Sequence, residues 1–197
     1  MYKKLNMTEN HLRILSLFTR GFDKEYYIRE VQRLLKISPR TAQLILDDME
    51  KKAVLESYTK GKIRLYKLRR TVEARDHIIF TETYKRIKFA EKSLKAKEII
   101  DRLAPKIDGI GLIFGSYAKG IEKKDSDIDV LIAGTYDKKE FERASSICRV
   151  KLDVKNYPLG LFKSELNKDI LIREALDNHV ILFGSEYLIN MIIKPKF

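Results

Sequence analysis

Cysteine, histidine and long apolar runs are all scarce in this sequence of 197 residues. Cys148 is the one cysteine, so no disulfide can form within the chain. No apolar run approaches the ~20 residues that a membrane-spanning helix needs. The segment Met1–Asn6 lacks the apolar stretch of a signal peptide. We therefore expect a cytoplasmic protein that does not engage a membrane.

The three histidines, His11, His77 and His179, lie far apart and without the spacing of metal ligands. We expect each of them to have a structural role. Cys148 lies on the apolar side of a predicted helix, and this position favours a place in the core over a role as nucleophile. We therefore expect neither histidine nor cysteine to take part in catalysis or metal binding, and acidic side chains are the remaining candidates.

The formal charge of +12 is distributed unevenly along the chain. Residues 1–70 contain 17 Lys and Arg against 8 Asp and Glu, whereas residues 106–197 contain 15 against 14. A basic segment beside a neutral one indicates that the first binds a polyanion and the second does something else. The alternative is a lysine-rich surface that serves solubility or heat tolerance.

Residues 8–69 show three short helical patterns followed by two strand-like runs. Thr8 is a candidate N-cap for the first helix, and Ser38 with Pro39 begins the third, since proline suits the first helical position. The strand-like runs are separated by Thr59-Lys60-Gly61-Lys62, which predicts a hairpin with a basic tip. This segment resembles the winged-helix domains of prokaryotic transcriptional regulators.

The winged-helix resemblance implies that two groups of residues contact DNA. In the third helix, only the amino-terminal end should approach DNA, because Asp47 and Asp48 would repel phosphate farther along. The alternatives are a solvated helix face or a protein-interaction module. The expected DNA contacts are Arg40, Thr41 and Gln43 from the helix and Lys60, Lys62 and Arg64 from the hairpin.

Residues 71–105 read as a long helical connector that Pro105 terminates, and it is either a linker or a dimerisation helix. We expect a homodimer. From Ile107 onward the pattern is α/β, with strands expected at 109–114, 127–133 and 150–155 and a helix at 141–148.

The expected strand 109–114 leads into Gly115-Ser116, a turn suited to phosphate. Glycine lets the backbone approach a bulky anion, and a helix that begins at Ser116 offers free N–H groups to phosphate oxygens. Lys119 adds positive charge near the distal phosphates, and Ser126 precedes the acidic pair of the next strand. We expect these four residues to contact a nucleotide.

Asp127 and Asp129 are two residues apart on an expected strand, so both side chains leave the same face. Asp153 alternates in the same way with Leu152 and Val154 on a later strand. Pairing of the two strands would gather three carboxylates, which repel one another unless divalent cations lie between them. Such a cluster suits two Mg²⁺ ions, with Asp153 as the proton acceptor or its organiser.

At these residues the chain resembles the polymerase-beta-like nucleotidyltransferase superfamily, and most closely its minimal members. Their hallmark is Gly-Ser, about ten residues, Asp-x-Asp and a third carboxylate on a later strand; here ten residues separate Ser116 from Asp127. The resemblance covers residues 106–190. Asp153 is matched by position and alternation alone, and Lys119 stands where many relatives have arginine.

The two resemblances imply an α+β protein with three parts. These are a winged helix-turn-helix at 1–70, a helical connector at 71–105 and a minimal nucleotidyltransferase domain with a small mixed sheet at 106–197. Catalysis and metal binding are expected from Asp127, Asp129 and Asp153.

The resemblance to minimal nucleotidyltransferases also implies a reaction. A nucleoside triphosphate, expected to be ATP, would donate its nucleoside monophosphate to a hydroxyl. Some minimal members are antitoxins that modify a toxin of the HEPN class, and the DNA-binding segment would then target or autoregulate the enzyme. The alternative is a transcriptional regulator whose nucleotidyltransferase domain is an inactive nucleotide sensor or a dimerisation scaffold.

Overall fold

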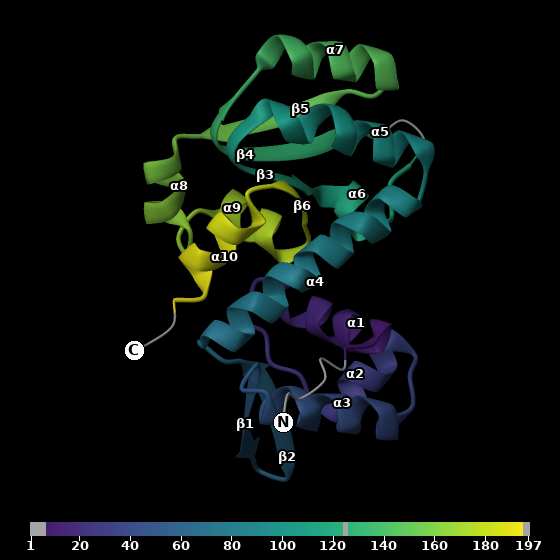
Figure 1. Cartoon of the computed structure of the whole chain (residues 1–197), viewed down its shortest axis with the longest axis vertical. Helices are drawn as coiled ribbons and strands as arrows, with labels where there is room; N and C mark the ends of the chain where they lie inside the picture. Colours follow the sequence, from purple (N-terminus) through teal and green to yellow (C-terminus); the bar gives the residue numbers. More distant parts are fainter. Residues whose placement is uncertain (1–6, 124–125, 195–197) are drawn as a thin grey trace, which may run out of the picture. The chain divides into compact units, whose positions relative to one another are not determined.

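The computed structural model describes residues 7–123 and 126–194 (Figure 1). They form two compact units, which divide the chain at Thr81 and again at Ile192. The division differs from the expected boundaries at residues 70 and 105. The first six residues of the expected first segment lie outside the described part. They are the residues that lack a signal-peptide pattern. The last three residues of the expected third segment also lie outside it.

The N-terminal unit begins with three helices that share one core. Ser38 caps the third helix by accepting the N–H of Thr41, and Pro39 occupies its first position. Buried side chains such as Leu15, Phe18 and Leu46 fill the space between the helices. The helices are α1 (Glu9–Phe18), α2 (Ile28–Leu35) and α3 (Pro39–Lys51).

An antiparallel hairpin follows α3, formed by β1 (Leu55–Lys60) and β2 (Ile63–Leu68). Lys60 pairs with Ile63, so Gly61 and Lys62 make the tip, where Gly61 has a φ of +62°. The order of elements agrees with the expected winged helix. The identity of this unit as a winged-helix domain stays a prediction.

The expected helical connector is two helices rather than one. The helix α4 (Val72–Glu91) contributes to both units, and α5 (Leu94–Leu103) begins at a new N-cap, Ser93, which accepts the N–H of Ala96. Ile99 and Leu103 of α5 are buried in the core of the second unit. Residues 94–103 are therefore part of that unit and not a free linker. Whether α4 dimerises stays a prediction.

The second unit contains a four-stranded mixed sheet in the order β5-β4-β3-β6. The central strands β3 (Ile107–Phe114) and β4 (Ile128–Tyr136) are antiparallel. The edge strand β5 (Leu152–Tyr157) is parallel to β4, and the short edge strand β6 (Val180–Phe183) is antiparallel to β3. The helix α7 (Lys138–Cys148) connects the parallel pair, as parallel strands require.

The sheet lies between two helical layers, which Figure 1 shows as α5 and α7 on one side and α8, α9 and α10 on the other. Ile128, Val130 and Ile132 of β4 point into the core made with α5 and α7, so the residues between them face the other layer. Cys148 is buried in the same core, where a structural role was expected. The second layer contains α8 (Leu159–Glu165), α9 (Ile170–Asp177) and α10 (Ser185–Ile192).

A buried ionic cluster joins the second half of α4 to the residue before β6. Glu82 and His179 are both fully buried, with 3.2 Å between Oε2 and Nε2, and Lys85 Nζ lies 2.8 Å from Glu82 Oε1. Burial alone would raise the pKa of Glu82, but electrostatic attraction and hydrogen bonds from Lys85 and His179 outweigh burial and lower that pKa to about 2. Both partners are needed because an uncompensated buried charge is strongly destabilising.

In the described part of the chain, none of the helices combines the length and the apolar character that crossing a membrane requires.

Candidate active site

The turn after β3 brings its backbone against an acidic side chain. Gly115 has a φ of +67° and begins the five-residue helix α6 (Gly115–Lys119). A Cβ atom added to Gly115 would lie 2.1 Å from Oδ2 of Asp129, so the Asp129 carboxylate would have to shift to admit it. Glycine is therefore favoured here by its backbone conformation, and its lack of a side chain lets that carboxylate approach closely. The Gly-Ser turn and the acidic strand meet at one point.

Strand register places the third acid beside the second. Asp129 of β4 pairs with Asp153 of the parallel strand β5, so the two side chains leave the same face of the sheet. Asp129 also pairs with Phe114, the residue that precedes Gly115. Asp127 lies just before the first residue of β4, rather than inside the strand as expected. All three acids are therefore at the same end of the sheet.

The electrostatics of Asp129 show how close the acids are. Partial burial raises the pKa of its carboxyl, and the negative charges of Asp153, Asp127 and Glu174 raise it further, while Lys155 partly offsets them. Glu174 is on α9, in the layer that faces this side of the sheet. Ionising Asp129 thus places a negative charge among like charges, an arrangement that costs stability and that a bound cation would relieve.

Two lysines of the β5 segment neutralise the other acids. Lys151 Nζ lies 2.5 Å from Oδ2 of Asp127, and Lys155 Nζ lies 3.1 Å from Oδ1 of Asp153. The hydrogen bond and charge of Asp127 raise the pKa of Lys151. Both lysine side chains are largely exposed to solvent. The ammonium groups therefore occupy carboxylate oxygens that a metal ion would need.

The carboxylates do not form a preformed metal site in their present rotamers. Within residues 7–123 and 126–194, no three His, Cys, Asp or Glu side chains are gathered closely enough to hold an ion. The donor set nevertheless fits a hard divalent cation, because two registered aspartates and a third nearby supply oxygen ligands. Asp127, Asp129 and Asp153 are the residues that would hold it, once the lysines release their oxygens.

The remaining expected nucleotide contacts are at the same end of the sheet. Ser116 is half-buried in α6, and Lys119 is exposed at the end of that helix. Ser126 uses its hydroxyl to accept the backbone N–H of Lys123 at 2.9 Å, so it shapes the loop before Asp127. Their contacts with a nucleotide stay predictions.

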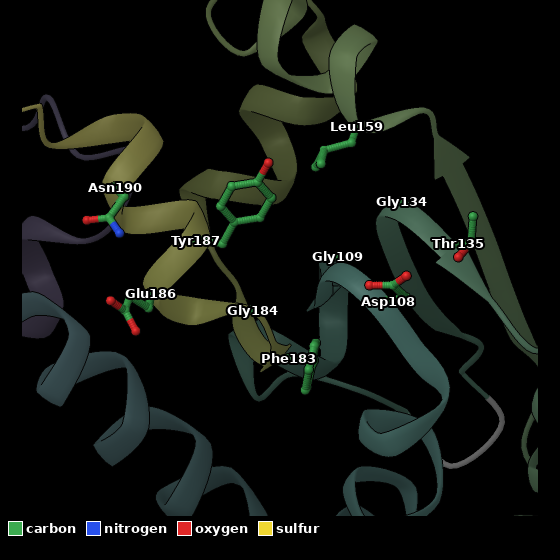
Figure 2. Close-up of a pocket in the computed structure, with 10 residues that line it drawn as sticks. All are labelled: Asp108, Gly109, Gly134, Thr135, Leu159, Phe183, Gly184, Glu186, Tyr187 and Asn190. Carbon is green, nitrogen blue, oxygen red and sulfur yellow. The ribbon is translucent and has the colours of Figure 1, made fainter.

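A cavity of the second unit lies elsewhere (Figure 2). It has a volume of about 630 Å³ and includes Asp108 and Thr135, which pair with each other across β3 and β4. Asp108 precedes Phe114 by six residues on β3, a separation of roughly 20 Å along a strand. None of the three acids lines this cavity. It is therefore distinct from the acidic site.

The residues expected to contact DNA differ in their surroundings. Arg40 and Gln43 are exposed on α3, Thr41 is half-buried beside its N-cap, and Lys60 and Lys62 are exposed at the hairpin tip. Arg64 instead forms ion pairs with Asp47 and Glu50 of α3, and its guanidinium lies over the ring of Tyr66. Of the two acids that were expected to repel phosphate from α3, Arg64 therefore pairs with Asp47, while Asp48 pairs with Lys52.

Sequence reasoning did not assign a role to Lys151, Lys155 or Glu174. The alternation of β5 places both lysines on the face of Asp153, so the pattern held a signal for their position. Nothing in the sequence pattern indicated Glu174, because α9 reaches Asp129 only through the folding of the chain.

Comparison with known proteins gives one family match. Residues 94–187 match the family model described as Polymerase beta, Nucleotidyltransferase. No curated protein and no solved structure matches the chain. The matched range begins at the first residue of α5, ends within α10 and includes the Gly-Ser turn and all three acids. This part of the chain is therefore similar to the polymerase beta nucleotidyltransferase family.

Proposed function

We propose that this protein transfers a nucleoside monophosphate from a nucleoside triphosphate, with ATP as the expected donor, to a hydroxyl group of an acceptor. The registered pair of Asp129 and Asp153 beside the Gly115 turn is the observation that carries the proposal. The family match supports nucleotidyl transfer in general. Mg²⁺, the donor base and the acceptor belong to the proposal.

In the proposed site, Asp127, Asp129 and Asp153 hold divalent cations, for which two Mg²⁺ ions are expected. When bound, the metal neutralises charge on the phosphates and lowers the pKa of the attacking hydroxyl. The chain itself supplies the backbone N–H groups that begin α6, which have no helical acceptors and suit phosphate oxygens. Ser116, Ser126 and Lys119 complete the contacts with the nucleotide.

Bond changes in the proposed reaction balance without another reactant. The acceptor oxygen attacks the α-phosphorus, and a new P–O bond forms. The bond from the α-phosphorus to the bridging oxygen breaks, and pyrophosphate leaves with that oxygen. The hydroxyl proton passes to Asp153, whose position beside Asp129 puts it within the same group of oxygens.

The transfer is tested with donors labelled in different phosphates. The protein is incubated with extract from its own cells and with ATP, GTP, CTP or UTP labelled at the α-phosphate, and parallel samples carry the label at the γ-phosphate. We expect macromolecular label from an α-labelled donor only, and none with Asp129→Asn. Label from the γ-phosphate would indicate phosphoryl transfer, and label from neither would leave the regulator alternative.

A DNA-binding role of residues 1–70 is proposed alongside the transfer activity. The +9 charge of this segment and the exposed Arg40, Lys60 and Lys62 support it, since phosphate contacts need accessible cations. The role would be targeting or autoregulation, as in an antitoxin whose acceptor is a HEPN-class toxin. In the alternative, the whole chain is a DNA-binding regulator and the nucleotidyltransferase domain senses nucleotide or dimerises.

DNA binding is tested by titrating fluorescent duplexes from the region upstream of the protein's own coding sequence at several salt concentrations. The affinity should fall steeply as salt rises, and Lys62→Ala should weaken binding and lower the salt slope by about one contact. Lys139→Ala, in the other unit, serves as the matched control. A salt-independent affinity, or equal effects of both substitutions, would contradict the proposal.

A further inference from the structure

Two lysine side chains pair with the aspartates of the acidic site. Lys151 contacts Asp127 at 2.5 Å and Lys155 contacts Asp153 at 3.1 Å. Lys155 also moderates the repulsion that Asp129 experiences from its acidic neighbours. Neither lysine is buried, with 75% and 46% of their side chains exposed, so both can move away without unfolding the domain.

A carboxylate oxygen engaged by an ammonium group is a poor metal ligand until that group leaves. A metal ion that takes these two oxygens without a nucleotide must therefore displace both lysines into water, and the two ion pairs are lost. Flexible lysine side chains, which carry point charges, readily exchange one anion for another. A triphosphate bound beside α6 would offer the displaced ammonium groups new anionic partners.

We propose that Lys151 and Lys155 couple metal binding to triphosphate binding, by holding the carboxylates of Asp127 and Asp153 until a metal–nucleotide complex displaces them. The inference rests on the proposed function, since it assumes that these carboxylates take the metal. It goes beyond that function because it assigns the two lysines a role in the order of binding. Free divalent cations bind weakly, and the metal–triphosphate complex binds tightly.

The coupling is reciprocal, so it can be measured from the metal side without any turnover. Isothermal titration follows Mn²⁺ binding to the full-length protein, alone and with adenosine 5′-(α,β-methylene)triphosphate, whose α–β bridge cannot be cleaved. For the wild type, we expect the analogue to raise the Mn²⁺ affinity at least about tenfold, within the usual range of coupling between two sites.

Removing the lysine charges should change the affinity for metal alone. Lys151→Gln/Lys155→Gln should bind free Mn²⁺ up to about fivefold more tightly per lost ion pair, which is the upper end of the range for exposed ion pairs. The ratio between the Mn²⁺ affinities measured with and without the nucleotide analogue should therefore be smaller than in the wild type. Lys151→Arg keeps the positive charge and should keep the coupling.

Lys163→Gln is the matched control, because Lys163 is exposed on α8 and has no ion pair within the described residues. It removes one positive charge from the same domain and should leave both Mn²⁺ affinities unchanged. A similar gain in Lys163→Gln would mean that general charge, not displacement, sets the affinity, and would overturn the inference.

Different results would overturn the proposed metal-dependent function and the inference about the two lysines. If the wild type binds no Mn²⁺ even with the analogue, the metal-dependent function itself is wrong. If the wild type binds both ligands but the double variant shows the same Mn²⁺ affinity and the same coupling, the function stands and the lysine inference is overturned. Thermal melts of every variant confirm that each is folded.

Discussion

Acidic side chains are arranged in opposite ways in the two units of this chain. In the N-terminal unit, Asp47 and Glu50 pair with Arg64, while Asp48 pairs with Lys52. In the second unit, Asp129 and Asp153 lie beside each other in register, and like charges surround Asp129. The first arrangement stabilises the fold, whereas the second raises the energy of the ionised site.

That difference indicates where function lies. A group whose environment opposes its ionised form marks a candidate functional site, because a structural role alone would select an oppositely charged partner. The second unit shows both arrangements within one domain, since its Glu82 is buried with Lys85 and His179. Compensated and uncompensated acids can therefore be compared by the same measurement on the same domain.

Replacing the compensated acid should have the largest effect on stability. Glu82→Gln leaves Lys85 and His179 without their carboxylate, and breaking a buried ion pair costs about 3 kcal/mol or more. Hydrogen exchange of the β3 amides in urea reports the stability of this domain. Glu98→Gln, which breaks an exposed pair with Arg102 on α5, is the control and should cost less than about 1 kcal/mol.

The pKa of Glu82 adds a pH signature to that comparison. Because the pKa is lowered to about 2 from the ordinary 4.5, Glu82 stabilises the fold above pH 4.5, and this stabilisation is lost as the pH falls toward 2. Glu82→Gln should lack this part of the acid-induced loss. Equal acid sensitivity in the two proteins would contradict the compensated arrangement.

The next largest effect is expected from a side chain added at Gly115, in the space that the Asp129 carboxylate occupies. Gly115→Ala forces a Cβ into Asp129 and strains a φ of +67°, so it should cost about 1–2 kcal/mol. It should also weaken binding of Mg-ATP at least about tenfold, measured by titration calorimetry, because the carboxylate is displaced by a steric contact. Gly61→Ala has a similar φ of +62° with nothing within 4 Å, so it isolates the backbone strain. Unchanged nucleotide binding by Gly115→Ala would contradict the close approach.

A smaller effect distinguishes structural from DNA-binding cations in the N-terminal unit. Arg64→Ala removes the ion pairs of Asp47 and Glu50 and should reduce the stability of that unit by about 1 kcal/mol. Lys62→Ala should leave stability unchanged, because the residue is exposed at the hairpin tip. Hydrogen exchange of the α3 amides measures the stability of the unit in both variants. If Arg64→Ala weakened DNA binding with no loss of stability, the internal ion pairs would not be the main role of Arg64.

The smallest effect has the opposite sign. The raised pKa of Asp129 means that the folded metal-free domain binds this proton more readily than the unfolded chain does. Stability therefore falls as the pH rises above the ordinary 3.8, and at neutral pH Asp129→Asn should melt at a slightly higher temperature than the wild type. Calorimetry of the metal-free protein from acid to neutral pH measures it. A loss of stability would show that Asp129 is compensated after all.

Local sequence patterns predicted the strands β3, β4 and β5 of the second unit but not β6. The run that ends at Phe114 and the alternation around Asp153 are local signals, and the structure has strands at both places. Alternation also indicated that Asp153 shares a face with its lysine neighbours. Because α7 connects β4 to β5 as parallel neighbours, the register of these two strands pairs Asp153 with Asp129. These features depend on spacing, which a sequence displays directly.

Features that depend on packing were not predictable in the same way. The single helix expected over 71–103 is divided because Ser93 caps α5, whose Ile99 and Leu103 bury themselves in the second unit. The partnership of Glu82 with His179 joins positions far apart in the chain, and no local pattern reveals it. Contacts of this kind require the folded chain.

Binding of Mg-ATP to the wild type and to Asp129→Asn, measured by isothermal titration calorimetry, tests the acidic site most directly. We predict that the wild type binds Mg-ATP, that chelation of the metal weakens the binding, and that Asp129→Asn loses it while remaining folded. Undiminished binding by the folded variant would contradict the assignment of the β4 and β5 aspartates as the metal–nucleotide site.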